Sequence, residues 1–178
     1  MLEADTLAAV VRRLKKAPLL PDGAGTQVRL GRSVVEDLLP HRGSMLLVDA
    51  VDAVSVPERA VRGRRRLDGG DPGFAGHFPD DPVYPGVLVV EAIGQLGLTL
   101  LHFVGGTTTE APWRRGLGRV RAVHIHRATF LAPFAPGDTM TLHAQVVERD
   151  ELTMVAAGQA WKDGTLAAFA VSEVYLDE

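Results

Sequence analysis

The longest apolar stretch of the chain runs from residue 87 to residue 104 and contains only four polar side chains. These are Glu91, Gln95, Thr99 and His102, and their spacing of four, four and three residues places them on one narrow stripe of an α-helix. A helix that is apolar around the rest of its surface is buried, either in a protein core or in a membrane. A carboxylate near the N-terminal end and three further polar side chains argue against the membrane. The pattern therefore predicts one central helix enclosed by other elements.

Strand-like segments lie on both sides of this helix in the sequence. Two precede it, near residues 45–54 and 59–67, and four follow it, near 117–131, 139–149, 152–162 and 165–176. Turn residues separate the later segments, and Asp163-Gly164 is a strong signal for a two-residue hairpin. Consecutive strands joined by short turns predict an antiparallel meander. The expected fold class is α+β, with an antiparallel sheet of about six strands wrapped around one long central helix.

Two further segments have patterns of their own. Residues 5–16 are amphipathic, with apolar side chains at helical spacing, and prolines interrupt the chain after them. We therefore expect a single domain over residues 1–178, with an N-terminal helical extension of about residues 1–32. Residues 68–86 are rich in Gly, Pro and Asp and predict a long ordered loop, a feature that is usually functional.

Composition narrows the class of protein. The chain has 178 residues, of which 46% are hydrophobic and 23% charged, and these values are typical of one globular domain and disfavour disorder. It contains no cysteine, which excludes disulfides, thiolate nucleophiles and cysteine-based zinc sites. The acidic N-terminus lacks the basic and apolar regions of a signal peptide, so we expect a cytoplasmic protein.

Charge is small in total and uneven along the chain. The net charge of −3 and the pI near 6.1 argue against a nucleic-acid-binding protein. Sixteen of the 19 basic residues are arginine. Three of them, at alternate positions 62, 64 and 66, are expected on one exposed face of a strand. Five more fall within a short stretch and predict a local basic patch: Arg114, Arg115, Arg119, Arg121 and Arg127.

Three residues suggest a reaction. A buried, unpaired carboxylate keeps its proton, so Glu91 on the buried helix is a candidate general acid. His77, which lies 14 residues earlier in the long loop, is a candidate general base. Gly86 opens the helix, where an unpaired N–H can stabilise negative charge on a closely approaching carbonyl. Together they fit proton abstraction next to a carbonyl with loss of a β-hydroxyl as water. Taken singly, His77 also suits a structural histidine and Glu91 a partner of the helix dipole.

A resemblance to a known family rests on a long motif. It reads Gly76-His77-Phe78-Pro79-Asp80-Asp81-Pro82-Val83-Tyr84-Pro85-Gly86-Val87-Leu88-Val89-Val90-Glu91-Ala92-Ile93-Gly94-Gln95. This segment resembles the signature of the β-hydroxyacyl-[acyl-carrier-protein] dehydratases of bacterial fatty-acid synthesis, which have the hotdog fold. Leu38-Leu39-Pro40-His41-Arg42 and Pro136-Gly137-Asp138 match further motifs of that family. The resemblance extends from about residue 34 to residue 176.

The resemblance implies a role for each matching residue. His77 would remove the α-proton, and Glu91, in place of the Asp of the isomerising branch, would protonate the leaving hydroxyl. The Gly86 N–H would bind the thioester carbonyl. The substrate-binding site would also include Val83, whose carbonyl would hold the His77 imidazole in the required tautomer.

The remaining implications concern support residues and partners. Gln95 would support the acid, and Tyr84 would line the substrate site. In this family the His and Glu of one site come from different subunits, which implies a homodimer or a higher even oligomer. No cofactor and no metal are implied. The partner would be an acidic acyl carrier protein, steered by Arg114, Arg115, Arg119 and Arg121.

Several alternatives stay open. Glu91 could activate water in an acyl thioesterase of the same fold, the enzyme could also isomerise the double bond, or the chain could be a non-catalytic partner of another dehydratase. The sequence departs from the family's motif in places, for example at Gly43-Ser44-Met45 after His41-Arg42. These departures leave the length of the acyl chain open and are compatible with a polyketide or polyene pathway. His124 and His126 share one strand face and could form a metal pair, although no third ligand is evident.

Overall fold

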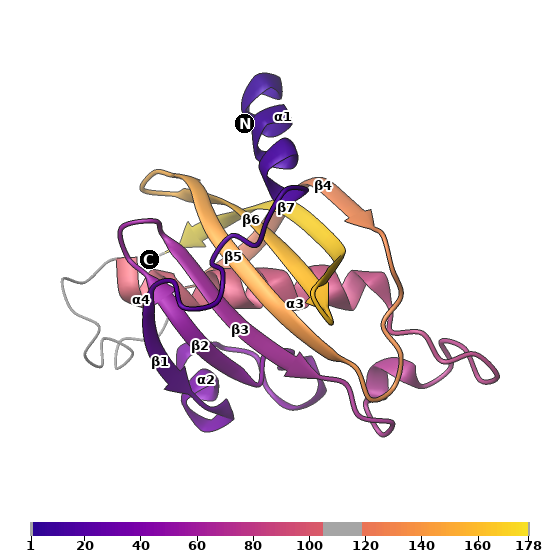
Figure 1. The fold of residues 1–178 in the computed structure, drawn as a ribbon. Coiled ribbons are helices and arrows are strands. Elements are labelled where there is room, and N and C mark those ends of the chain that lie inside the picture. The colour runs from indigo at the N-terminus through magenta and orange to yellow at the C-terminus, as the bar shows by residue number, and fades with distance from the viewer. Residues whose placement is uncertain (1, 105–118, 178) are drawn as a thin grey trace.

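One antiparallel sheet curls around a helix in the computed structural model, which describes residues 2–104 and 119–177 (Figure 1). Within these residues the sheet has seven strands in the order β1-β2-β3-β5-β6-β7-β4. The strands are β1 (Thr26–Leu30), β2 (Ala50–Ser55), β3 (Ala60–Arg66), β4 (Arg119–Phe130), β5 (Thr139–Arg149), β6 (Thr153–Lys162) and β7 (Thr165–Asp177). The helices are α1 (Ala4–Leu14), α2 (Arg32–Leu38), α3 (Gly86–Thr99) and α4 (Leu101–Val104), with 3-10 turns at Gly43–Met45 and Pro72–Phe74.

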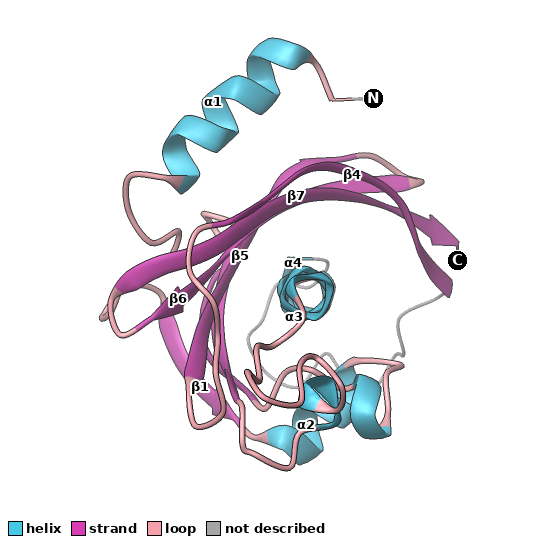
Figure 2. Ribbon diagram, turned by 90° about the vertical axis from the view of Figure 1, so that its right-hand side faces the viewer, coloured by secondary structure: helices cyan, strands magenta, loops and turns pink. Residues whose placement is uncertain are grey.

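The expected central helix is present as α3, which lies inside the curl of the sheet (Figure 2). It packs against β3, β5, β6 and β7, and α4 continues it after a break at Leu100. Although Gly86–Val104 is long and apolar enough to cross a membrane, most of it is buried by protein. A glycine of the sheet, Gly158 on β6, makes this close packing possible because Ile93 of α3 occupies the space that a Cβ atom would need.

The sheet differs from the expected meander in three places. β5, β6 and β7 form consecutive hairpins as predicted, but β4 pairs with β7 and lies at the sheet edge. β1 was not expected, because it has only five residues and none of them is buried, so the strand leaves little hydrophobic signal in the sequence. β2 begins at Ala50 and not at residue 45, since Gly43–Met45 forms a 3-10 turn and residues 46–49 follow it outside the ladder.

The N-terminal helix covers the outer face of the sheet. Figure 2 shows α1 on the convex side, opposite α3. Its last residue, Leu14, is fully buried in a cluster with Phe169 and Val171 of β7 and Val155 of β6. The apolar side chains of the amphipathic segment at residues 5–16 therefore pack against the sheet.

Residues 15–22, here called the strap, connect α1 to the rest of the chain and lie on three buried polar side chains of the sheet. Gln159 of β6 accepts a hydrogen bond from the Leu19 N–H and donates to the carbonyls of Leu14 and Ala17. Gln159 is fully buried, so these bonds satisfy its amide where water cannot. They fix the strap at one point of the sheet.

The other two side chains stand beside Gln159 in the register of the sheet. His143 of β5 pairs with Gln159 on one side and with Arg62 of β3 on the other. The Nδ1 atom of His143 accepts a hydrogen bond from the Leu20 N–H, at 3.3 Å. Arg62 forms an ion pair with Asp22 at the end of the strap. The expectation that Arg62 is exposed is therefore wrong, because the strap covers it; Arg64 and Arg66 are exposed as expected.

Candidate active site

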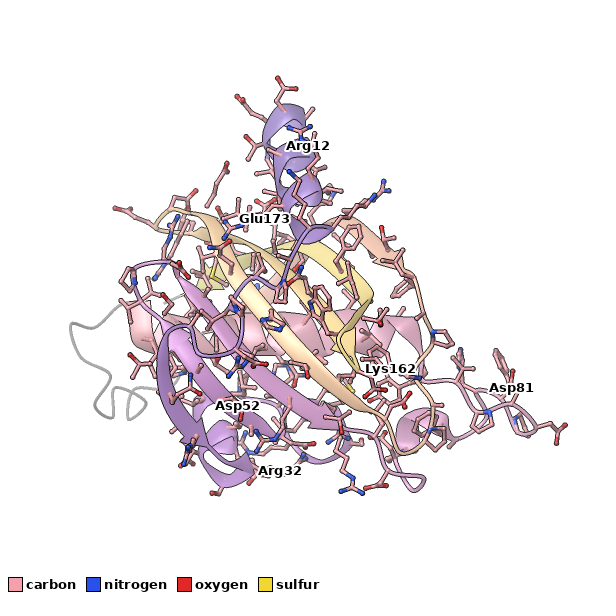
Figure 3. All side chains as sticks on the ribbon, viewed as in Figure 1. Arg12, Arg32, Asp52, Asp81, Lys162 and Glu173 are labelled. Carbon is pink, nitrogen blue, oxygen red and sulfur yellow. The ribbon has the colours of Figure 1, made fainter. Side chains whose placement is uncertain are left out.

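The long loop before α3 holds His77 in a fixed orientation. The loop projects from one end of the sheet, and Figure 3 shows Asp81 at its outer tip. Inside the loop, the Nδ1 atom of His77 lies 2.7 Å from the Val83 carbonyl oxygen, and the Val83 N–H donates to the His77 carbonyl at 2.9 Å. A carbonyl oxygen can only accept, so the imidazole proton resides on Nδ1. Nε2 is left with a free lone pair and can accept a proton.

An apolar pocket surrounds His77. The N-terminal turn of α3 contributes Gly86, Val87 and Val89, and the end of β4 contributes Phe130. The walls are completed by Val83, Tyr84, Leu131, Ala132, Pro133, Phe134 and Ala168. Several of its apolar side chains are half exposed or more, with Val87 at 73%. Such a cleft suits an acyl chain whose reacting end lies near His77 and the start of a helix.

Tyr84 forms part of the buried wall of this pocket. It is 2% exposed, and its ring contacts Phe74 edge-on at 5.3 Å between centroids. Burial, together with the charge of Asp71, raises the pKa of the Tyr84 hydroxyl. Tyr84 therefore stays neutral and gives shape to the pocket.

The N-terminus of α3 lies at the floor of the pocket. Gly86 is the first residue of the helix, and the earliest backbone N–H groups of a helix have no acceptor within it. The ring of Phe130 lies directly against Gly86, where a Cβ atom would be 2.8 Å from it. This end of the helix therefore offers N–H donors and positive dipole charge to an oxygen of the substrate.

Glu91 lies one turn further along α3 and is hydrogen-bonded, contrary to expectation. Gln95 donates to Glu91 Oε1 at 2.8 Å, and Nε2 of His41 lies 3.4 Å from the same oxygen. These contacts, the one with His41 first, lower the pKa of Glu91 in spite of its burial. The expectation of a buried, unpaired carboxylate at Glu91 is therefore wrong for this chain. The side chain is 39% exposed and has partners, so its ionised form is stabilised.

The predicted polar stripe of α3 is present along the helix. Gln95 is buried and also binds the Met45 carbonyl and the Leu47 N–H, each at 2.8 Å. Thr99 donates to the carbonyl of Leu96, and His102 binds the carbonyl of Leu38. The stripe thus anchors the segment around α2 to the central helix.

The structure does not bring His77 and Glu91 into one pocket of a single chain. Glu91 is not among the residues that line the His77 pocket, and its partners are His41 and Gln95. Reasoning from residue patterns assigned no role to His41, 50 positions before Glu91, because no periodicity connects the two. The only signal for His41 was its place in the Pro40-His41-Arg42 motif.

The remaining candidate residues lie on and before β4. Arg114 and Arg115 fall outside the described residues, Arg119 begins β4, and Arg121 is exposed on that strand. His124 and His126 stack with 4.3 Å between ring centroids, and His126 bonds to Glu173 of β7 at 2.9 Å. No group of three potential metal ligands occurs among residues 2–104 and 119–177.

Comparisons with known proteins agree with this architecture. A family model for the FabA-like domain matches residues 39–170. The 3-hydroxyacyl-[acyl-carrier-protein] dehydratase FabZ of Aliarcobacter butzleri is 32% identical over 136 residues, which are 76% of this chain and 90% of that protein. The protein of the same name from Chlamydia trachomatis is 33% identical over 144 residues, covering 81% and 88% of the two chains.

Solved structures confirm the fold. A putative thioesterase from Ralstonia eutropha superposes with a TM-score of 0.52 at 15% identity, over 71% of this chain and 83% of that one. A mutant thioesterase from Pseudomonas aeruginosa gives 0.52 at 14% identity, over 71% and 79%. The sheet wrapped around α3 is the hotdog fold, as expected. The matched family model and the dehydratase relatives, each covering about three quarters of the chain or more, show that this protein belongs to the FabA-like family.

Proposed function

We propose that this protein is a 3-hydroxyacyl-[acyl-carrier-protein] dehydratase, a hydro-lyase that forms trans-2-enoyl thioesters. The observation that carries the proposal is the His77 imidazole, whose Nε2 is kept free to accept a proton by the bond to Val83, in an apolar pocket at the N-terminus of α3. The dehydratase relatives bear names for the same reaction. Elimination of water needs this combination of a base, an acid and a site for a negative oxygen.

The proposed reaction assigns each group one step. His77 Nε2 takes the proton from the carbon next to the thioester carbonyl, and that electron pair forms the new double bond as the β-carbon–oxygen bond breaks. Glu91 gives its proton to the departing hydroxyl, which leaves as water. The Gly86 N–H accommodates the negative charge that develops on the carbonyl oxygen. Gln95 supports Glu91, and Tyr84 lines the acyl pocket. The side chains only accept and donate protons, and the elimination of water is not a redox reaction, so we propose no cofactor.

The active unit in this proposal is a homodimer or a higher even oligomer, with His77 and Glu91 of one site supplied by different chains. Two features support it. Glu91 does not line the His77 pocket of its own chain. β4 is an edge strand in the described sheet, and its apolar side chains Val123 and Ile125 are 57% and 56% exposed. A second copy would cover this edge.

The partner in this proposal is an acidic acyl carrier protein, attracted by Arg121 and by the arginines that precede it in the sequence. We place the protein in the cytoplasm, in fatty-acid synthesis or in a related polyketide or polyene pathway. It acts as one domain with its N-terminal extension and requires neither nucleic acid nor membrane insertion.

The proposal predicts that His77→Ala and Glu91→Gln each abolish formation of the enoyl product. Each variant removes one proton-transfer group, and such groups contribute on the order of 100- to 10,000-fold to a rate. The purified protein is incubated with a 3-hydroxyacyl carrier thioester, and mass spectrometry follows the loss of one water from the carrier-bound chain. Wild-type activity in either variant, with folding and oligomeric state unchanged, would contradict the assignment.

A thioesterase is the second candidate. The observation in its favour is the lowered pKa of Glu91, because an ionised carboxylate can activate a water molecule. The same mass measurement separates the two reactions. A thioesterase releases the free carrier thiol, whereas a dehydratase leaves the acyl group on the carrier, lighter by one water. A non-catalytic partner subunit would produce neither change when incubated alone.

A further inference from the structure

His41 lies against Glu91 in a contact that the proposed reaction does not yet use. It belongs to the loop between α2 and the 3-10 turn at Gly43–Met45, and its side chain is 23% exposed. Nε2 lies 3.4 Å from Glu91 Oε1, while Nδ1 is buried and has no hydrogen-bond partner in the described part of the chain. The imidazole thus has one polar contact, and that contact is the carboxyl group proposed as the acid.

The loop that carries His41 is held on both sides. After His41, Gln95 binds the Met45 carbonyl and the Leu47 N–H. Beside it, the Arg42 guanidinium donates to the carbonyls of Leu39 and His41, at 2.6 and 2.7 Å. The position of His41 is therefore set by the protein and is not that of a free surface side chain.

The buried Nδ1 atom determines which ring nitrogen of His41 can act as the donor. A proton on Nδ1 would place an unpaired N–H where water cannot reach it. The tautomer with its proton on Nε2 avoids this cost and directs that N–H toward Glu91 Oε1. The other groups facing the pair are the neutral amide of Gln95 and the Arg42 guanidinium, which is turned toward backbone carbonyls.

Both donors bind the same oxygen of Glu91. Gln95 and His41 contact Oε1, and Oε2 makes no hydrogen bond to the described residues. A carboxyl group held in this way carries its transferable proton on Oε2, since Oε1 already accepts two donors. The arrangement fixes which oxygen faces the substrate and stabilises the carboxylate that remains after the proton has left.

We propose that His41 is a positioning residue for Glu91, which holds Oε1 through Nε2–H so that Oε2 delivers the proton to the leaving hydroxyl. This inference rests on the proposed dehydratase function. It predicts that loss of the donor weakens Glu91 as an acid without weakening substrate binding. The kcat should fall and KM should remain nearly constant.

The test compares His41→Ala with His41→Gln, whose amide nitrogen can take the place of Nε2 as a donor. We expect His41→Ala to lower kcat on the order of 10-fold at nearly constant KM, and His41→Gln to recover most of the loss. A second readout is independent of turnover: carbon NMR titration of the Glu91 carboxyl, with the signal assigned by its absence in Glu91→Gln. The Glu91 pKa should rise in His41→Ala, because the largest cause of its lowering is removed, and should stay near the wild-type value in His41→Gln.

Arg42→Ala is the matched control, since it loosens the same loop without removing a donor to Glu91. It should leave the Glu91 pKa at the wild-type value. An equal rise in Arg42→Ala and His41→Ala, or no rise in His41→Ala, would overturn the inference. These outcomes are distinct from failure of the proposed function, which would appear as a wild-type protein that does not dehydrate, or as an active Glu91→Gln.

Discussion

Gly86 and the ring of Phe130 meet at the point where the substrate carbonyl is proposed to bind. A methyl group on Gly86 would come within 2.8 Å of the ring, but Phe130 is 53% exposed and has room to move. The fold should therefore tolerate alanine at this position. Substrate binding should be impaired by this alanine, because its methyl group would occupy the space next to the N–H donors of the helix.

We predict that Gly86→Ala lowers kcat/KM on the order of 100-fold and changes the free energy of unfolding by less than about 1 kcal/mol. Steady-state kinetics and urea unfolding measure the two effects. The double variant Gly86→Ala/Phe130→Ala is the control, because it removes the ring and keeps the methyl group. If the double variant were as active as Phe130→Ala alone, displacement of the ring and not obstruction of the substrate would explain the loss.

At the scale of single residues, the sequence predicted which residues form the site better than it predicted their contacts and pKa values. The Gly76–Gln95 motif contains His77, Gly86, Glu91 and Gln95, and the structure gives each a defined contact or position. It did not predict that the pKa of Glu91 would be lowered. That property depends on His41, which is brought to α3 by the packing of a distant loop and not by any local pattern.

At the scale of elements, α3 and the hairpins of β5, β6 and β7 were predictable because an all-round apolar helix and a clear turn signal identify them. β1 and the strap were not. The strap has no periodicity, and its place on the sheet follows from three polar side chains on three different strands, Arg62, His143 and Gln159. Side chains of this kind are expected at a surface until the segment that covers them is known.

The strap makes stability depend on pH through His143. Burial, assisted by the charge of Arg62, lowers the pKa of His143 from 6.5 to about 4. Between these two values the unfolded chain binds a proton that the folded chain does not, so stability falls as the pH is lowered from about 6.5 toward 4. Protonation would also turn the Nδ1 acceptor into a donor that faces the Leu20 N–H.

We predict that the wild-type protein loses about 2 kcal/mol more unfolding free energy between pH 7 and pH 5 than His143→Asn does. The asparagine oxygen can accept from Leu20 but does not titrate, and other titrating groups such as His102 contribute equally to both proteins. Urea unfolding at the two pH values measures the difference. Equal losses would show that His143 is not linked to folding in this way.

At the scale of the whole molecule, the two ends of the sheet are not equivalent. β1 and β4 are the edge strands of the described sheet, and large apolar side chains that are mostly exposed lie on β4 but not on β1. These side chains include Val123 and Ile125. Sequence patterns describe one chain at a time, so they show that Val123 and Ile125 alternate with His124 but not what would cover these two side chains.

The central claim is that His77 of one chain acts with Glu91 of another, and mixing the two inactive variants tests it most directly. His77→Ala and Glu91→Gln are refolded together in equal amounts, and dehydration of a 3-hydroxyacyl carrier thioester is measured. Half of the dimers should then be mixed, each with one intact site, so the mixture should regain about a quarter of the wild-type activity. A mixture that forms mixed dimers and remains as inactive as its two components would contradict the shared site.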